Sequence, residues 1–140
     1  MRALVDTSVW SLALRRRAKD LNAREKTLVR ELSELIKEGR AAIIGAVRQE
    51  VLSGIRDEML FERLRQHLRF FPDDPTVVED YEQAARFSNH CRAAGIAGTP
   101  VDFVICSVAT RLNLAIFTTD PDFRHYAKCV PIHLHVVQPD

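Results

Sequence analysis

Four acidic residues, far apart in the chain, are the side chains best suited to catalysis. Asp6 and Asp120 each follow a short apolar stretch that is typical of a buried strand, and each also opens a helix. Asp102 is the third residue of another expected helix, after Thr99 as the N-cap and Pro100 at the first position. The carboxyl ends of parallel strands meet at one edge of a sheet, where open α/β folds bind their ligands. We therefore expect Asp6 and Asp120 to converge at that edge.

Glu50 is the fourth acid and differs from the others because it lies inside an expected helix. It borders the apolar face that Val47 and Val51 form, and Gly54 leaves space beside it one turn further on. A carboxylate turned toward the interior costs free energy, and like charges brought together raise one another's pKa. A hard divalent cation such as Mg²⁺ or Mn²⁺ relieves both costs. Acid clusters that hold such an ion serve the hydrolysis of phosphodiesters, because the ion converts water into hydroxide.

Each acid also has an ordinary structural explanation. Aspartate is a good helix N-cap, an acid in the first turn suits the helix dipole, and a glutamate on a helix is commonly solvated. Two other classes of function therefore stay open: a receiver-type Mg²⁺-binding signalling domain, and a catalytically silent binding module whose acids only cap helices. The receiver class requires a lysine at the end of a late strand, where this sequence has none, and it leaves Glu50 without a role.

Apolar stretches alternate with amphipathic segments along the whole chain. Strands are expected at residues 2–5, 41–44 and 114–118, with an edge strand at 133–137 and a further short strand at 69–71. Helices are expected at residues 9–14, 23–37, 46–55, 57–68, 76–94 and 100–112, with another beginning near residue 120. Strands that alternate with helices predict an α/β fold in which helices cover both faces of a parallel sheet.

The composition is that of an ordinary globular domain. The chain has 140 residues, of which 46% are hydrophobic and 28% are charged, and its formal net charge is +1. We expect one domain spanning residues 1–140, with any RNA contact made by local basic patches. The sequence shows no apolar run long enough to cross a bilayer and no signal peptide, and its three cysteines lack metal or disulfide spacing. These features predict a cytoplasmic protein that does not associate with membranes.

Four stretches, in this order, resemble the PIN-domain family and, within it, the VapC-type toxins of toxin–antitoxin pairs. They are residues 5–10, 46–54, 99–109 and 116–123, and the resemblance covers essentially the whole chain. It implies a three-layer α/β/α PIN-like domain with a central parallel sheet of four to five strands. It also implies the toxin of a type II toxin–antitoxin system, a Mg²⁺- or Mn²⁺-dependent endoribonuclease. The implied partners are a VapB-type antitoxin, an RNA substrate and a second copy of the toxin in a homodimer.

The resemblance also assigns roles to individual residues. The expected catalytic and metal-binding residues match the family's four acids: Asp6, Glu50, Asp102 and Asp120. Around them, Thr7 and Thr119 are candidates to hydrogen-bond the carboxylates, and Asp122 matches a more variable acid that holds a water or caps a helix.

A basic cluster closes the first expected helix. Its arginines are candidate contacts for RNA phosphates, with a solvated helix end as the alternative: Arg15, Arg16 and Arg17. Trp10, nearby, is expected to fill the core or a groove that faces the antitoxin.

Overall fold

The computed structural model describes residues 1–138. Within that range four parallel strands form one sheet, in the order β2-β1-β3-β4. The strands are β1 (Ala3–Val5), β2 (Ala41–Ala42), β3 (Ala115–Phe117) and β4 (His133–Leu134). Ala3 lies opposite Ala41 on one side and Ala115 on the other, so β1 and β3 are the central strands.

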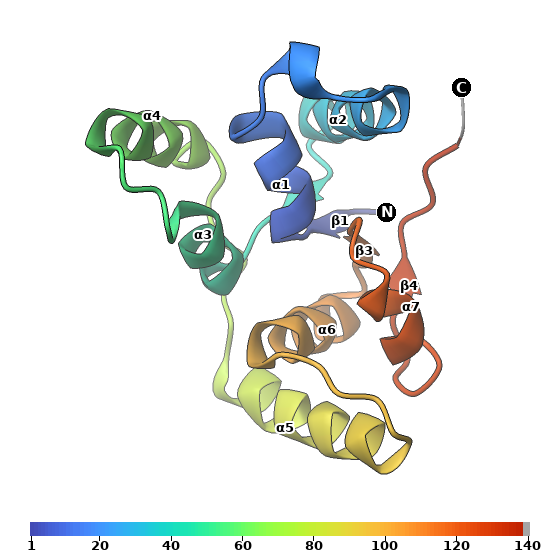
Figure 1. Cartoon of the computed structure of the whole chain (residues 1–140). Coiled ribbons are helices and arrows are strands. Elements are labelled where there is room, and N and C mark those ends of the chain that lie inside the picture. Colours follow the sequence, from blue (N-terminus) through green and yellow to red (C-terminus); the bar gives the residue numbers. More distant parts are fainter. Residues whose placement is uncertain (139–140) are drawn as a thin grey trace.

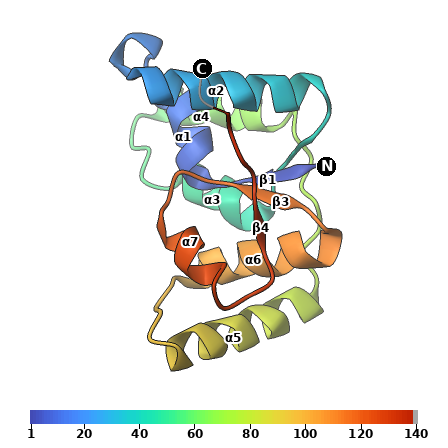
Figure 2. The ribbon, with the colours of Figure 1, turned by 90° about the vertical axis from the view of Figure 1, so that its right-hand side faces the viewer.

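Helices cover both faces of the sheet. Residues 1–138 include α1 (Thr7–Leu14), α2 (Ala23–Lys37), α3 (Gly45–Leu52), α4 (Glu58–Leu68), α5 (Val78–Ala93), α6 (Pro100–Leu112) and α7 (Asp122–Tyr126), with a 3-10 helix at Ala18–Asp20. In Figures 1 and 2, α1 and α2 lie on one face of the sheet, while α6, with α5 outside it, covers the other. The expected three-layer α/β/α fold with a four-stranded parallel sheet is confirmed.

The two central strands are short and apolar because both of their faces are covered. Every residue of β1 and β3 is buried. Trp10 belongs to this core, since it is 1% exposed and its ring packs against Phe71 with 5.1 Å between centroids. Of the two positions that the sequence left open for Trp10, the structure shows the core. None of the helices in residues 1–138 is both long and apolar enough to cross a membrane.

Local sequence signals define helix α6 accurately. The Thr99 hydroxyl accepts a hydrogen bond from the Asp102 N–H at 3.2 Å, and Pro100 occupies the first helical position. Asn113 adopts the left-handed conformation, with φ of +55°, and ends the helix. These features place Asp102 in the first turn, as the sequence predicted.

One expected strand is absent and several expected boundaries were wrong. The strand expected at 41–44 is limited to Ala41–Ala42, and the helix expected at 46–55 spans Gly45–Leu52. Residues 69–71 form no strand, because the Phe71 N–H bonds the Leu68 carbonyl at 3.0 Å and continues the helical winding of α4. The long helix α5 begins at Val78, and the side chain of Asp80, not that of Thr76, accepts the N–H of Val77. The edge strand is limited to His133–Leu134.

Candidate functional site

The four acids come from segments that begin or end at the same edge of the sheet. Asp6 directly follows β1, Asp120 follows β3, and Glu50 lies on the helix that starts just beyond β2. Asp102 reaches this edge on a helix that precedes a strand, whereas the other three acids lie after a strand. It lies in the first turn of α6, and a helix that leads into a parallel strand starts where the other strands end.

Asp6 is a buried carboxylate without a cationic partner. It is 5% exposed, and its Oδ2 accepts hydrogen bonds from the hydroxyls of Ser8 at 3.0 Å and Thr118 at 2.7 Å. Burial raises the pKa of Asp6, the negative charge of Glu50 raises it further, and the two hydroxyls offset only part of this effect. Within residues 1–138 no lysine, arginine or histidine pairs with Asp6.

Asp102 is half-buried and is held by a tyrosine. Its Oδ2 accepts a hydrogen bond of 2.6 Å from the hydroxyl of Tyr126, whose ring packs between Phe103 and Phe123. Burial is the main cause that raises the pKa of Asp102, and the charges of Asp6 and Asp120 contribute to it. Burial and the neighbouring carboxylate of Asp102 raise the pKa of Tyr126 as well, which favours the protonated hydroxyl that donates this bond.

Gly98 makes room for this tyrosine. A Cβ atom at this position would lie 2.6 Å from the Tyr126 hydroxyl oxygen and 2.8 Å from a ring carbon of Phe103. A larger residue would therefore force Tyr126 away from Asp102. The sequence signals for the pair were weak, because Gly98 reads as an ordinary loop residue and Tyr126 as a surface aromatic.

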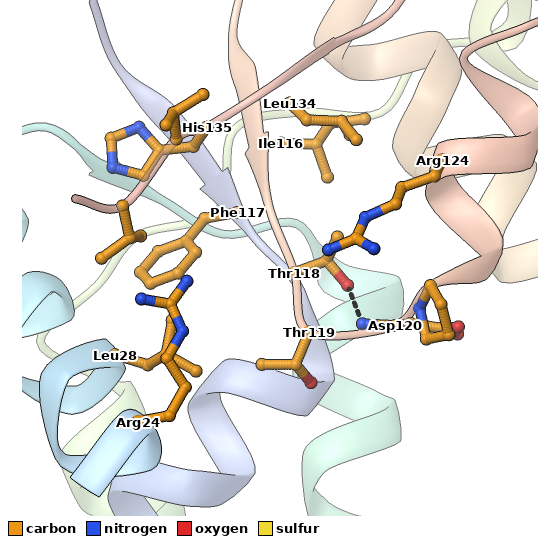
Figure 3. Close-up of a pocket in the computed structure, with 13 residues that line it drawn as sticks. Arg24, Leu28, Ile116, Phe117, Thr118, Thr119, Asp120, Arg124, Leu134 and His135 are labelled. Carbon is orange, nitrogen blue, oxygen red and sulfur yellow. Dashed lines mark hydrogen bonds between the residues drawn. The ribbon is translucent and has the colours of Figure 1, made fainter. Parts of the chain in front are cut away.

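Asp120 is fixed by the turn that follows β3. Its own N–H donates to the Thr118 hydroxyl at 3.0 Å, as Figure 3 shows, and its Oδ1 accepts the N–H of Asp122 at 2.9 Å. The N–H of Thr119 donates to the Ser8 hydroxyl at 3.0 Å. Two hydroxyl side chains, Ser8 and Thr118, therefore tie the end of β1 to the end of β3 around Asp6.

The sequence placed this supporting role one residue away from where the structure shows it. The candidates were Thr7 and Thr119, but the Thr7 hydroxyl is buried without a hydrogen-bond partner in the described part of the chain. Thr119 contributes its backbone N–H instead of its side chain. Ser8 and Thr118 were missed because neighbouring hydroxyl residues are equivalent in sequence, and only the directions of the side chains distinguish them.

Glu50 is exposed instead of half-turned toward the interior, whereas Val47 and Val51 on the same helix are buried. It lines a hollow of about 310 Å³ with Val101, the neighbour of Asp102. Its charge nevertheless raises the pKa of Asp6. Glu50 therefore belongs to the electrostatic surroundings of Asp6 without sharing its burial.

The basic cluster at the end of α1 is solvated. All three arginines are exposed, and two of them form ion pairs of 3.6 Å, Arg16 with Glu25 and Arg17 with Asp20.

The chemistry of the donor set suits a hard divalent cation. The acids offer only oxygen atoms, and the hydrogen-bond partners of Asp6 and Asp102 are uncharged hydroxyl and backbone N–H groups. Burial, with a smaller contribution from the charges of neighbouring carboxylates, raises the pKa of both aspartates, and a bound cation would offset both causes. In the same range, no three His, Cys, Asp or Glu side chains are already assembled around one point. The carboxylates thus sense one another's charge without forming a finished coordination sphere.

A comparison with known proteins defines the class to which this fold and this group of acids belong. A family model described as PIN domain matches residues 3–128. The chain therefore belongs to the PIN domain family. A search of curated proteins finds no match.

Solved structures from several bacteria have the same fold. FitAcB from Neisseria gonorrhoeae is 19% identical, with a TM-score of 0.74 and 96% of each chain covered. VapBC2 from Rickettsia felis, bound to a DNA fragment from their promoter, is 16% identical, with a TM-score of 0.75 and 96% of this chain and 98% of that chain covered. A toxin–antitoxin complex from Klebsiella pneumoniae is 19% identical, with a TM-score of 0.65 and coverages of 86% and 89%. At these identities the likeness shows the fold alone.

Proposed function

We propose that this chain is a VapC-type toxin, a cytoplasmic endoribonuclease that requires Mg²⁺ or Mn²⁺ and hydrolyses RNA phosphodiesters. The observation that carries the proposal is the state of Asp6, a buried carboxylate that has hydroxyl partners but no cationic partner among the residues that the structure describes. Burying an ionised group without a counter-charge is costly, and the pKa of Asp6 is raised for that reason. A buried carboxylate without a counter-charge is expected where its charge serves to bind a ligand.

Asp6, Asp102 and Asp120 would hold the ion, with Glu50 reaching it directly or through water. When bound, the ion supplies hydroxide at neutral pH and neutralises charge on the cleaved phosphate, leaving a 5′ phosphate and a 3′ hydroxyl. The side chains that hydrogen-bond the acids orient them. Ser8, Thr118 and Tyr126 donate hydrogen bonds to Oδ2 of Asp6 and Asp102, and these bonds fix how the two carboxylates lie.

Each orienting group acts on one carboxylate. Thr118 and Ser8 hold Asp6 between the ends of β1 and β3, and Tyr126 holds Asp102 from the side of α7. None of the four acids has to act as a general base under this proposal.

The test is cleavage of total RNA by the purified chain. We expect fragments with Mg²⁺ or Mn²⁺, none with EDTA, and none from Asp102→Asn. Asp20→Asn is the matched control, because Asp20 is an exposed aspartate whose carboxylate pairs with Arg17 outside the group of acids, and its replacement should leave cleavage unchanged. Cleavage that persists in EDTA or in Asp102→Asn would refute the proposal.

A binding measurement tests the metal site independently of activity. Calorimetric titration with Mn²⁺ should give binding to the wild-type chain, strongly weakened binding to Asp102→Asn, and unchanged binding to Asp20→Asn. Equal binding by all three chains would place the ion elsewhere.

The partners are part of the same proposal. The solved structures of this fold include toxin–antitoxin complexes, and by this likeness we assign the chain a VapB-type antitoxin and a homodimeric state. Co-purification with the product of a neighbouring small gene tests the first assignment. Light scattering of the isolated chain tests the second, since a monomeric mass would contradict the dimer.

A further inference from the structure

A pocket of about 440 Å³ lies directly beside Asp120. Its walls come from α2, the residues that end and follow β3, the start of α7, and the segment after β4 (Figure 3). Its volume is in the range of roughly 300–1,000 Å³ that is usual for small-ligand sites. Thr118, Thr119 and Asp120 line one end, so the pocket begins where the group of acids ends.

Two arginines from separate elements border this pocket. Arg24 comes from α2 and Arg124 from α7, and both side chains lie among the lining residues in Figure 3. Both side chains are exposed, and neither side chain forms an ion pair or a hydrogen bond with another residue in the range 1–138. Arg111 and Arg48, in contrast, are ion-paired. The pocket therefore carries two cations whose charges are not neutralised by the protein.

The floor between the arginines is apolar and firmly held. Leu28, Phe117 and Leu134 contribute to it. The ring of Phe117 packs against that of His135, with 5.2 Å between centroids, and His135 in turn lies 2.7 Å from a carboxylate oxygen of Glu31. Because Phe117 and Leu28 are only 1% and 7% exposed, the accessible apolar surface of the pocket comes mainly from Leu134, Val136 and Val137. Apolar surface next to guanidinium groups suits a base attached to a phosphate.

The acids themselves make such a site necessary for a ribonuclease. Four carboxylates repel the phosphates of an approaching strand, and a net charge of +1 over the whole chain provides no general attraction. Cations next to the acids would offset that local repulsion. Among the arginines, Arg24 and Arg124 line the same pocket as Asp120, whereas Arg16 and Arg17 are engaged with carboxylates.

We propose that this pocket binds one nucleotide of the RNA strand next to the cleaved bond, with Arg24 and Arg124 each contacting one of the two phosphates that flank this nucleotide and the apolar lining contacting its base. The assignment rests on the proposed function and adds a substrate subsite to it. An acidic segment of a protein partner would use the same two cations. Single-stranded RNA is favoured because the pocket opens beside Asp120, where the strand must pass to reach the acids.

The test measures RNA binding in chains that cannot cleave. In an Asp102→Asn background, Arg24→Gln and Arg124→Gln are introduced singly and together, with Arg86→Gln as the matched control. Arg86 is an exposed arginine on α5, and no ion pair or hydrogen bond of Arg86 is found among the described residues. The probe is a labelled pool of random single-stranded RNA of about a dozen nucleotides, titrated at several salt concentrations.

We expect the double variant to bind roughly tenfold or more weakly and its log K against log salt slope to fall by about 1.4, since each phosphate contact to a single strand contributes about 0.7. Arg86→Gln should change neither quantity. Unchanged slope and affinity in the double variant would overturn the subsite. So would unchanged RNA binding combined with lost affinity for the antitoxin, which would assign the pocket to a protein partner.

The failure of this inference is separable from that of the proposed function. If the wild-type chain cleaves RNA and the double variant binds and cleaves equally well, only the subsite is wrong. If the wild-type chain neither cleaves RNA nor binds the pool, both are wrong.

Discussion

Asp6 and Asp80 are both buried carboxylates, 5% and 2% exposed, but their surroundings differ in one decisive respect. Asp80 receives two hydrogen bonds from the guanidinium of Arg111, at 2.8 and 2.9 Å, and a third from the N–H of Val77. Burial alone would raise the pKa of Asp80, but these bonds outweigh burial and lower it. Asp6 has two hydroxyl donors and acidic neighbours, and its pKa is raised.

The difference separates an acid that joins elements from an acid that is kept for a ligand. The pair of Asp80 and Arg111 connects α5 to the last turn of α6, at the other end of this helix from Asp102, and its charges cancel inside the protein. The negative charge of Asp6, in contrast, is not balanced by a cationic side chain within residues 1–138. A buried charge that the protein does not compensate points to an external counter-charge, which under the proposed function is the metal ion.

Neutralising the two aspartates should separate catalysis from stability. Asp6→Asn preserves the size of the side chain and its hydroxyl contacts but removes the charge, so we expect RNA cleavage to fall on the order of a thousandfold. Asp80→Asn should leave the cleavage rate per folded molecule within about twofold, because Asp80 lies outside the group of acids. Cleavage rates normalised by the folded fraction from circular dichroism measure both. A large loss in Asp80→Asn would erase the distinction.

The structural pair should dominate stability. Arg111→Met leaves the Asp80 carboxylate buried without its counter-charge, and we expect the free energy of unfolding to fall by about 2–3 kcal/mol, at the lower end for a buried pair because Arg111 is partly exposed to water. Urea unfolding followed by circular dichroism checks this value. Arg65→Met is the control, since the pair of Arg65 and Glu62 lies at the surface and its loss should change stability little.

The hydrogen bond from Tyr126 to Asp102 should affect activity more than folding. Tyr126→Phe keeps the ring packing and removes only the donor, so we expect cleavage to fall about tenfold with little change in stability. The pH profile should also move. The tyrosine hydroxyl lowers the pKa of Asp102, so its removal should shift the acid limb of the profile to higher pH. An unchanged pH profile would show that Tyr126 serves packing alone.

The smallest expected effect is a difference in the pH dependence of stability. The pKa of Asp80 is lowered from its ordinary 3.8, so its contribution to stability is present above that pH and is lost as pH falls through the lowered pKa. The pKa of Asp6 is raised from 3.8, so its contribution is present below that pH and is lost as pH rises through the raised pKa. We therefore expect Asp6→Asn to stabilise the metal-free chain at pH 7 and to lose that advantage as the pH falls. Urea unfolding at a series of pH values in EDTA tests the sign.

Some of the contacts around these acids could be predicted from the sequence, and others could not. The cap of α6 could be predicted because Thr99, Pro100 and Asp102 act within one turn of helix. Asp80 and Arg111 are 31 residues apart and lie on different helices, so no local sequence pattern predicted that they pair. For the same reason Ser8 and Thr118, whose hydroxyls meet at Asp6 across 110 residues, could not be distinguished from their neighbours Thr7 and Thr119.

The expected strand at residues 69–71 illustrates the opposite failure. Its aromatic residues favour extended structure, but the backbone of Phe71 is used by α4 and by the guanidinium of Arg48, which donates to its carbonyl. Burial of Phe71 against Trp10 then stabilises the turn. Intrinsic β propensity was overruled by tertiary packing.

The sequence by itself determined the order of the strands and helices, apart from the strand expected at 69–71, and the positions of Asp6, Asp102 and Asp120 at the ends of elements, because hydrophobic periodicity and helix capping act over a few residues. The tertiary structure decided which of the buried carboxylates acquired a cation, which hydroxyls hold Asp6, and that Arg24 and Arg124 share one pocket. Those outcomes depend on distances between side chains that are far apart in the chain, and such distances exist only after the layers have packed.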